Sequence, residues 1–317
     1  MIGNKCAFLF PGQGAQYPGM GKDFYDTFPI ARQTFEEADD LLKRKLSSII
    51  FGDNEVLLTE TRNSQPAIFV VCMAILRVIA LEFPDIKPKV CSGLSLGEYT
   101  ALTAANYLSF EDGIKLVANR CAFMNDDCVA YPGTMAVILG LSAGVVEEMV
   151  RELQLPNDLW AANFNCPGQV VISGTAHGIA KGIEAAKAKG ARRTLPLQVH
   201  GAFHSGLMKK AGKRLVEYIE ATAFKESSIN VVMNVTGTSA KGIADIKQNL
   251  TLQVTHSVRW EQGVRYMMEN GVDMYLEIGP GTALTGFNGK IGVKGPSLNV
   301  STVADLQGLK VFYTQTA

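Results

Sequence analysis

The residue in this chain best suited to covalent chemistry is a serine at position 95. Glycines stand two residues before it and two residues after it in Gly93-Leu-Ser-Leu-Gly97, which fits the G-x-S-x-G pattern of a nucleophile elbow. Glycines at these positions let a strand and a helix approach closely around a strained residue. The same pattern also occurs as an ordinary Gly/Ser turn before a helix, so the motif alone leaves both interpretations open.

The residues on either side of Ser95 favour the catalytic interpretation. Lys87 to Ser92 is typical of a short strand that leaves a proline-bearing loop, and Glu98 to Ala105 is rich in Ala and Leu without a helix breaker. Ser95 would then lie at a helix N-terminus, where the dipole and free N–H groups stabilise developing negative charge.

A serine nucleophile needs a base, and the chain has four histidines. His177 and His256 lie near predicted helix starts and are interpreted as surface or capping groups. His200 and His204 flank a Gly-Ala-Phe loop directly after a predicted subdomain, where we expect a cleft between domains. These two are the candidate bases.

Two further features could bind negative charge. Pro11-Gly-Gln-Gly-Ala-Gln16 follows the strand-like run Lys5 to Phe10 but lacks the Lys-Ser/Thr of a phosphate loop, so it is either an oxyanion cradle or a simple βα turn. Arg120 lies among apolar residues of a predicted helix, Glu111 to Met124, which begins after the capping residue Ser109. Its side chain either anchors an anion or extends to solvent, and its neighbours alone favour the second.

The composition is that of an ordinary globular enzyme. Of 317 residues, 47% are hydrophobic and 19% charged, and the net charge of zero provides no basic surface for nucleic acid or an anionic membrane. The longest apolar run, Ala67 to Ala80, contains Arg77 and is too short to span a bilayer. A strand-like run begins at Cys6 and leaves no room for a signal peptide. We therefore expect a cytoplasmic protein without membrane contacts.

The six cysteines are scattered along the chain without C-x-x-C or zinc-ligand spacing. In a chain without a secretion signal, such cysteines are interpreted as reduced thiols of the core. We expect no metal site.

The predicted elements form an α/β core around a buried parallel sheet. Its strands include Lys5 to Phe10, Val231 to Val235 and Asp273 to Ile278, and Gln65 to Leu76 is a buried helix with Pro66 near its first position. The pattern fades from about Lys294, and no clear core pattern is evident from Thr302 onward.

Residues 131 to 197 interrupt this core with the order β-α-β-β-α-β, which is typical of a ferredoxin-like unit. We therefore predict a hydrolase-like, discontinuous catalytic core over residues 1–130 and 198–317, and a ferredoxin-like subdomain over residues 131–197.

A series of motifs runs along the chain in a fixed order. They are Phe10-Pro-Gly-Gln-Gly-Ala-Gln16, Gln65-Pro-Ala67, the elbow followed by Glu98-Tyr99, Arg120 with Met124, Asn163 to Ile172, Gly201-Ala-Phe-His-Ser205 and Glu277-Ile-Gly-Pro-Gly281. On these motifs the chain resembles the malonyl-CoA:acyl-carrier-protein transacylases of type II fatty-acid synthesis. The resemblance covers roughly Cys6 to Gly292 and is highly specific.

The resemblance implies an acyltransferase that works by ping-pong transfer. Ser95 would attack the thioester of malonyl-CoA with His204 as general base, and the thiol of acyl carrier protein would then resolve the malonyl-serine. It also implies that backbone N–H groups of Gln13 and Leu96 form the oxyanion hole. Malonyl-CoA is the donor substrate, and no cofactor is expected.

Further residues receive roles from the same resemblance. Arg120 would pair with the free malonyl carboxylate, and Phe203 would exclude the α-methyl group of a methylmalonyl substrate. Asn163 and Gln253 are placed among the substrate-binding residues, and a backbone carbonyl near Gln253 would orient His204. The enzyme is expected to use a dyad without an aspartate and to be a monomer.

One position departs from the family pattern, which has histidine where this chain has Leu94. Because Leu94 precedes the nucleophile, it could alter packing around Ser95. Three alternatives remain beside fatty-acid synthesis, and only the last of them is motivated by Leu94. They are a discrete malonyl acyltransferase that serves a polyketide synthase, a hydrolase with water as acceptor, and a degenerate scaffold that binds the carrier protein without catalysis.

Overall fold

The structure is a computed structural model that describes residues 5–199 and 201–316. The chain forms two compact units. The first comprises the residues up to 121, residues 222–232 and the residues from 266 onward. The second comprises residues 122–221 and 233–265. Each unit has its own sheet.

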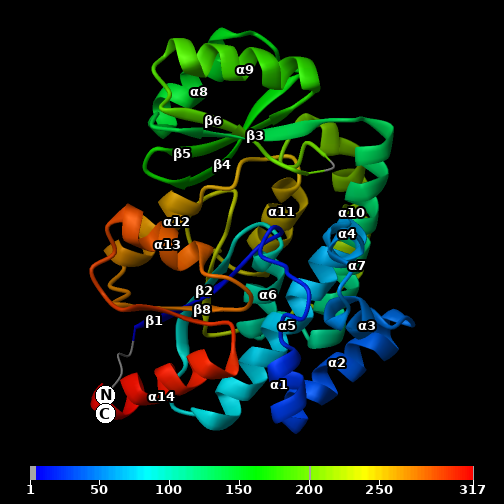
Figure 1. Cartoon of the computed structure of the whole chain (residues 1–317), viewed down its shortest axis with the longest axis vertical. Coiled ribbons are helices and arrows are strands. Elements are labelled where there is room, and N and C mark those ends of the chain that lie inside the picture. The colour runs from blue at the N-terminus through cyan, green and yellow to red at the C-terminus, as the bar shows by residue number, and fades with distance from the viewer. Residues whose placement is uncertain (1–4, 200, 317) are drawn as a thin grey trace. The chain divides into compact units, whose positions relative to one another are not determined.

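The first unit is built on a parallel sheet of five strands. Its order is β7-β2-β1-β8-β9, with every adjacent pair parallel. Figure 1 labels its three middle strands, β1, β2 and β8. The strands are β1 (Cys6–Phe10), β2 (Pro88–Gly93), β7 (Asn230–Val232), β8 (Met274–Ile278) and β9 (Ser297–Val300). All five residues of β1 are buried, as a central strand between two neighbours requires. The predicted α/β class with a parallel core is confirmed.

Helix α5 (Thr61–Glu82) is the buried helix of this unit, and it starts earlier than predicted. Pro66 was expected near the first position of a helix that starts at Gln65, but it lies inside the helix because the helix begins at Thr61. At 22 residues, α5 could cross a membrane by length and composition, so the argument that the run is too short was wrong. Burial of 78% of its most apolar window is instead typical of the core helix of a globular protein.

Four short or amphipathic helices precede α5. They are α1 (Lys22–Thr27), α2 (Pro29–Leu42), α3 (Leu46–Phe51) and α4 (Glu55–Thr59). Helix α2 ends at Leu42, where Lys43 adopts a left-handed conformation with φ 52°.

Two helices that follow the elbow serine carry further site residues. Helix α6 (Gly97–Ala104) contacts β1 and β2. Helix α7 (Phe110–Ala130) starts after Ser109, whose Oγ accepts a hydrogen bond from the Asp112 N–H at 3.0 Å, as the predicted cap requires. The first part of α7, up to Cys121, belongs to the first unit, and the rest belongs to the second.

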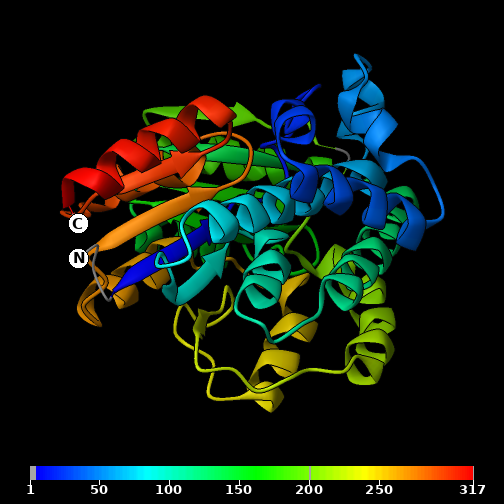
Figure 2. The same ribbon diagram turned by 90° about the horizontal axis from the view of Figure 1, so that it is seen from below.

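The C-terminal segment is part of the first unit's core, although its sequence from Thr302 onward shows no clear core pattern. After α13 (Ala283–Ile291), β9 pairs with β8, and α14 (Val303–Thr316) lies beside β9 (Figure 2). Leu306 and Leu309 are the buried apolar residues of α14. A helix with so few core contacts on one face has a weak apolar periodicity, which explains why the sequence did not indicate it.

The second unit contains the predicted ferredoxin-like fold. Its elements are β3 (Thr134–Leu139), α8 (Ala143–Glu152), β4 (Leu159–Cys166), β5 (Gln169–Gly174), α9 (Ala176–Ala188) and β6 (Arg193–Pro196). The antiparallel sheet has the order β4-β5-β3-β6, and both helices pack against it (Figure 1). The βαββαβ prediction is confirmed, while the boundaries at residues 131 and 197 stay a prediction.

The second unit also contains the segment with the candidate base. After β6 come the 3-10 turn η1 (Gly206–Met208), α10 (Lys209–Ala221), α11 (Ile243–Gln253) and the start of α12 (Trp260–Glu269). Residues 257–259 run beside β4. The Phe164 N–H of β4 donates a hydrogen bond to Val258 O at 2.9 Å. The segment after α11 therefore lies against the ferredoxin-like sheet.

Candidate active site

Ser95 lies at the turn between β2 and α6 in the first unit. It adopts a left-handed backbone conformation, with φ 53°. A non-glycine residue in this region is strained by about 1–3 kcal/mol and persists only where its surroundings impose it. The strained serine between strand and helix is the geometry of a nucleophile elbow.

The glycines around Ser95 are required by close backbone contacts. A Cβ atom on Gly93 would lie 2.0 Å from the carbonyl carbon of Gly97, and a Cβ on Gly97 would lie 2.2 Å from Phe10 O. A Cβ on Gly12 would lie 2.4 Å from Leu94 O. The elbow therefore packs against both β1 and the Gly-rich loop through backbone atoms alone.

Arg120 of α7 lies beside the nucleophile. Its side chain is fully buried, so the expectation from its neighbours that it extends to solvent was wrong. Nη2 donates to Ser95 Oγ at 3.0 Å, and Nη1 donates to Gln65 Oε1 at 2.5 Å. Its guanidinium also lies over the ring of Tyr99, 5.5 Å from the centroid.

The charge of Arg120 is the main electrostatic feature next to Ser95. Burial lowers the pKa of its guanidinium, but arginine stays protonated in proteins at neutral pH. The nucleophile therefore has a buried cation within hydrogen-bond distance. Such a cation can bind an anionic group on an acyl chain attached to Ser95.

The Gly-rich loop after β1 is tied to the same cluster. Gln65 Nε2 donates to Gln13 Oε1 at 3.2 Å, and Gln13 Nε2 donates to Thr61 Oγ1 at 3.4 Å. Within residues 5–199 and 201–316, neither the Gln13 N–H nor the Leu96 N–H donates to a protein acceptor. These two amides are therefore available to a substrate oxygen.

His204 lies in the second unit, in the segment before η1. It is buried and, like Ser95, has a left-handed conformation, with φ 57°. Its Nδ1 lies 2.8 Å from Gln253 O and 3.2 Å from His256 O. Because a carbonyl oxygen can only accept, Nδ1 carries the proton and Nε2 keeps a lone pair that can act as a base.

Contacts within the second unit fix the segment that carries His204. A Cβ on Gly201 would lie 2.1 Å from Cys128 Sγ, so α7 and this segment touch at a glycine. Phe203, the predicted specificity residue, is buried, and so is Asn163 on β4. Ser205 Oγ accepts from the Leu207 N–H at 3.2 Å and so caps η1.

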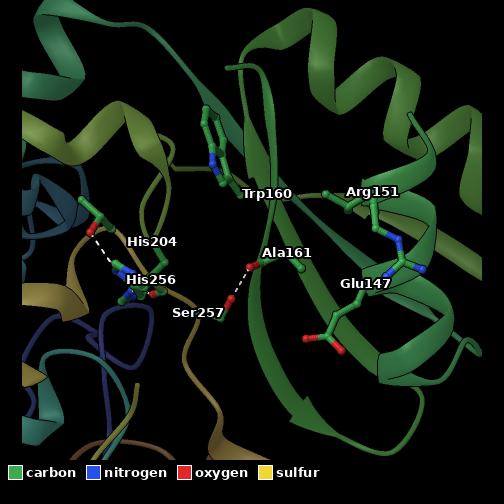
Figure 3. Close-up of a pocket in the computed structure, with 9 residues that line it drawn as sticks. Glu147, Arg151, Trp160, Ala161, His204, His256 and Ser257 are labelled. Carbon is green, nitrogen blue, oxygen red and sulfur yellow. Dashed lines mark hydrogen bonds between the residues drawn. The ribbon is translucent and has the colours of Figure 1, made fainter. Parts of the chain in front are cut away.

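A cavity of about 450 Å³ in the second unit includes the candidate base (Figure 3). Its lining residues are Glu147, Val150, Arg151, Trp160, Ala161, His204, Thr255, His256 and Ser257. Glu147 and Arg151 of α8 lie on one side, and His204 and His256 lie on the other (Figure 3). Both apolar and charged groups thus surround the space next to His204.

The predicted residues divide between the two units. Ser95, Leu96, Gln13 and Arg120 belong to the first, and His204, Phe203, Asn163 and Gln253 belong to the second. The contacts given above for each set lie within its own unit. The pairing of Ser95 with His204 stays a prediction. The other candidate base, His200, lies outside the described residues, and His177 is exposed as predicted.

Sequence reasoning gave no role to two features that the structure brings out. The side chain of Gln65 binds Arg120, and the main-chain carbonyl of His256 contacts His204. Gln65 did belong to one of the recurring motifs, which could have identified it. A backbone carbonyl carries no signal in the residue type, and only the resemblance indicated that one near Gln253 would orient His204, whose Nδ1 lies 2.8 Å from Gln253 O.

Among the described residues, no three His, Cys, Asp or Glu side chains gather in an arrangement that could hold a metal ion. All six cysteines are buried thiols.

Comparisons with known proteins identify similar sequences and similar structures. An acyl transferase domain family matches residues 7–297 of the chain. A curated malonyl CoA-acyl carrier protein transacylase from Bacillus subtilis is 42% identical over 299 residues, which is 94% of each chain. The crystal structure of such a transacylase from Clostridium perfringens matches with a TM-score of 0.93 and 35% identity, covering 98% of both chains.

A further solved structure contains a bound partner. It is a malonyl-transacylase in complex with a type II PKS acyl-carrier protein. The transacylase matches this chain with a TM-score of 0.91 and 36% identity, covering 96% of this chain and 98% of its own.

Proposed function

Because this chain belongs to the malonyl-CoA:acyl-carrier-protein transacylase family of acyl transferases, we propose that it transfers malonyl groups from coenzyme A to acyl carrier protein. The acceptor is the phosphopantetheine thiol of the carrier, and the product supplies fatty-acid synthesis. The reaction passes through a malonyl ester of Ser95.

The observation that carries this proposal is the position of Arg120. Its buried guanidinium lies 3.0 Å from Ser95 Oγ and forms a planar fork of donors. Such a fork binds a carboxylate through two parallel hydrogen bonds. A malonyl group on Ser95 ends in a carboxylate, whereas an acetyl group does not, so the site favours the dicarboxylic acyl group.

The first half-reaction forms the malonyl-serine. As Ser95 Oγ attacks the thioester carbonyl carbon, Nε2 of His204 takes the hydroxyl proton, and the carbonyl oxygen becomes an oxyanion. The N–H groups of Gln13 and Leu96 bind this oxyanion. When the intermediate collapses, the C–S bond breaks and coenzyme A leaves as a thiol with the proton from His204. A single oxyanion-hole donor is typically worth about 2.7–4 kcal/mol of barrier.

The second half-reaction reverses these steps with a different thiol. The thiol of acyl carrier protein gives its proton to His204 and attacks the ester carbonyl of the malonyl-serine. The C–O bond then breaks, and Ser95 recovers the proton. Because only an acyl group and a proton are exchanged, the reaction requires no cofactor.

The direct test is the intact mass of the protein after mixing with malonyl-CoA, with Ser95→Ala as the control. We expect a malonyl adduct on the wild type and none on the variant. No adduct on either protein would contradict the covalent mechanism, and Leu94 would then be the first residue to examine. An adduct that releases malonate rapidly without carrier protein would instead indicate a hydrolase.

One observation favours a second candidate pathway. A structural relative binds the acyl-carrier protein of a type II PKS, so malonyl transfer to a polyketide carrier is the alternative acceptor reaction. Transfer rates to a fatty-acid carrier and to a polyketide carrier, measured with the same malonyl-enzyme, distinguish the two. A clear preference for the polyketide carrier would contradict the fatty-acid assignment.

We further propose that the enzyme works as a cytoplasmic monomer, without contacts to membranes or nucleic acid. All proposed site residues come from one chain, and the net charge of zero offers no general attraction to polyanions. Light scattering of the purified protein checks the monomer, since a stable dimer would double the measured mass.

A further inference from the structure

The first turn of α5 contains a gap in its hydrogen bonding. Pro66 lies inside this helix and has no N–H, so it cannot donate to the carbonyl of Arg62 four residues earlier. A helical carbonyl without its usual donor needs another partner. The first turn of α5 therefore depends on groups from outside the helix.

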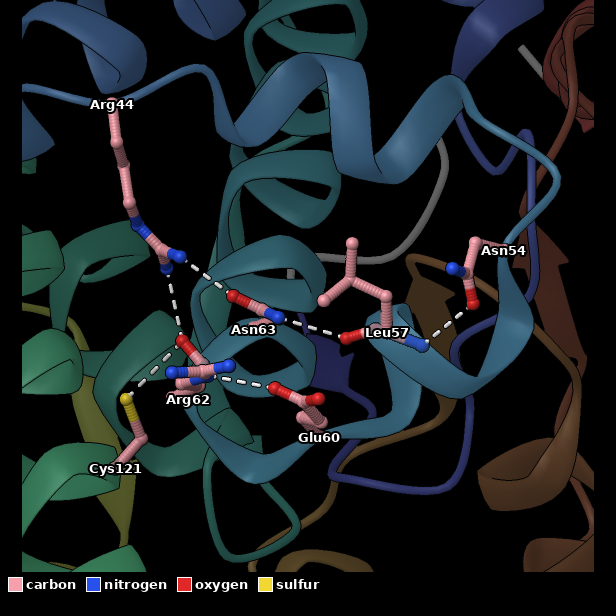
Figure 4. Close-up of polar contacts among 7 residues, drawn as sticks. All are labelled: Arg44, Asn54, Leu57, Glu60, Arg62, Asn63 and Cys121. Carbon is pink, nitrogen blue, oxygen red and sulfur yellow. Dashed lines mark hydrogen bonds and ion pairs between the residues drawn. The ribbon is translucent and has the colours of Figure 1, made fainter.

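Arg44 supplies that partner from the segment after α2. Its Nη2 donates to Arg62 O at 2.9 Å, and its Nη1 donates to Asn63 Oδ1 at 2.6 Å (Figure 4). Asn63 is buried, and its Nδ2 donates to Leu57 O at 2.8 Å. One guanidinium thus holds two consecutive residues of the turn, in the geometry for which its fork is suited.

The same turn supports the residues that face the acyl group. Gln65 is the residue just before Pro66, and its amide binds both Arg120 and Gln13. A second connection joins Cys121 to the turn, because its Sγ lies 3.7 Å from Arg62 O. Arg44 and Cys121, the residue that follows Arg120, therefore both contact the carbonyl oxygen of Arg62.

We propose that Arg44 is a positioning residue for the carboxylate site of the acyl group. By holding Arg62 and Asn63, it fixes the first turn of α5, and that turn fixes Gln65 against Arg120 and Gln13. Arg44 itself does not touch the substrate. This inference rests on the proposed function, since it assigns Arg44 to the recognition of the malonyl carboxylate.

The chain offers a matched control in Arg77. This arginine also connects the α2 region to α5, because Nη1 donates to Thr34 Oγ1 at 3.0 Å and to Glu37 Oε2 at 2.7 Å. It lies about three turns beyond Gln65 in the same helix. Arg77→Ala removes a similar contact without touching the first turn.

The experiment measures Ser95 loading from malonyl-CoA and from acetyl-CoA, for the wild type, Arg44→Ala, Arg44→Lys and Arg77→Ala. We expect Arg44→Ala to lower the ratio of malonyl to acetyl loading by about tenfold, because Arg120 loses its alignment with the carboxylate. Arg44→Lys keeps one donor and should give an intermediate ratio. Arg77→Ala should leave the ratio unchanged.

Unfolding temperatures of the four proteins separate positioning from a loss of folded protein. If Arg44→Ala lowers loading from both acyl donors by the same factor, or Arg77→Ala shifts the ratio equally, the inference is wrong. If Arg44→Ala is too unstable to assay, the ratio for Arg44→Lys decides in the same way. A wild type without any malonyl adduct would contradict the proposed function and this inference together, whereas an adduct with unchanged ratios contradicts the inference alone.

Discussion

The positive charge beside Ser95 comes from Arg120, which the fold buries completely against Gln65 and Ser95. Its neighbours in sequence suggest instead an arginine that extends to solvent. Periodicity in one helix cannot reveal this burial, because the polar partners come from α5 and from the elbow. Only the resemblance to a family assigned the anion-binding role.

Replacing Arg120 with alanine should abolish the preference for malonyl groups. Without the guanidinium, the malonyl carboxylate is buried without a partner, so we expect malonyl loading of Ser95 to fall by about a hundredfold. Acetyl loading should fall little or rise. Loading rates from the two acyl-CoA donors, measured by mass spectrometry, check this, and an equal loss of both would show that Arg120 is structural.

Adding one methyl group at Gly97 should disrupt the elbow. Gly97→Ala places a Cβ about 2.2 Å from Phe10 O, where only backbone movement can relieve the contact. We expect the free energy of unfolding to fall by about 1–3 kcal/mol. The rate of Ser95 loading should fall by more than this loss of stability alone explains.

Gly286→Ala in α13 is the matched control, because no atom beyond its chain neighbours and the backbone of its own helix lies within 4 Å of the added Cβ. It should leave loading unchanged and raise stability slightly, by about 0.4–1 kcal/mol. Urea unfolding curves compare the two variants, and equal stabilities would contradict the interpretation.

At the scale of elements, a buried carboxylate from strand β8 caps the first turn of helix α13. Glu277 at the end of β8 is buried, and its two carboxylate oxygens accept from the Leu284 N–H at 3.1 Å and the Thr285 N–H at 2.7 Å. These residues lie in the first turn of α13. The carboxylate therefore caps the helix from the neighbouring strand.

This cap should give the enzyme a pH-dependent stability. Burial raises the pKa of Glu277 above its ordinary value of 4.5, so the folded protein binds the proton more tightly than the unfolded chain. The contribution of Glu277 is therefore most favourable at low pH and decreases as the pH rises from about 4.5 through the folded pKa.

Urea unfolding of wild type and Glu277→Gln across this range measures the effect. We expect the wild type to lose stability relative to the variant as the pH rises. Glu269→Gln, at an exposed position, is the control for replacing a glutamate by glutamine. Parallel pH profiles for wild type and Glu277→Gln would contradict the prediction.

Helix α14 should contribute to stability but not to chemistry. Leu306 and Leu309 are buried, and the Val303 N–H donates to Asp23 Oδ2 at 2.6 Å. Deleting residues 303–317 should lower the unfolding temperature by several degrees, since each buried leucine is worth about 1.5–3 kcal/mol. Ser95 loading per folded molecule should stay the same. An unchanged unfolding temperature would show that the helix is not part of the core.

Helices and strands with a strong apolar periodicity could be predicted from the sequence. Helices whose position depends on a few side-chain contacts could not. The βαββαβ order and the central strands follow from alternating and continuous apolar runs. Helix α14 was missed because its apolar side is narrow, and the start of α5 was misplaced because Pro66 suggested a first position. In the structure, Arg44 satisfies the carbonyl that this proline leaves without a donor, and the sequence does not indicate such a contact.

At the scale of the whole molecule, the cysteines should be unreactive in the native state. All six are buried, and burial raises the pKa of Cys128 to about 11 and that of Cys6 to about 12. Because the thiolate is the reactive form, we expect no rapid reaction with a thiol reagent at pH 8 and six reactive groups after denaturation. Rapid labelling of the native enzyme would contradict this.

The division of the site residues between two units limits what the sequence could establish. The motifs lie in different kinds of local structure. Gln65 to Ala67 belongs to helix α5, Arg120 and Met124 belong to helix α7, and Ser95 lies at the turn between β2 and α6. The nucleophile Ser95 and its neighbours lie in the first unit, and the base His204 and its neighbours lie in the second. This division follows from the path of the whole chain, which local sequence patterns do not encode. The resemblance supplied the pairing of Ser95 with His204 that these patterns lack.

The strand order of the first unit has a consequence for synthesis on the ribosome. Strand β1 lies between β2 and β8, so the central position of the sheet is filled by residues 6–10 and completed only when residues 274–278 have been translated. Until then the nascent chain carries a fully apolar strand with an open edge, a form that promotes aggregation. The ferredoxin-like segment, in contrast, is continuous and can fold as soon as it emerges. We therefore expect ribosome-bound chains that end before β8 to depend on chaperones, and chains that extend past β9 to be released from them.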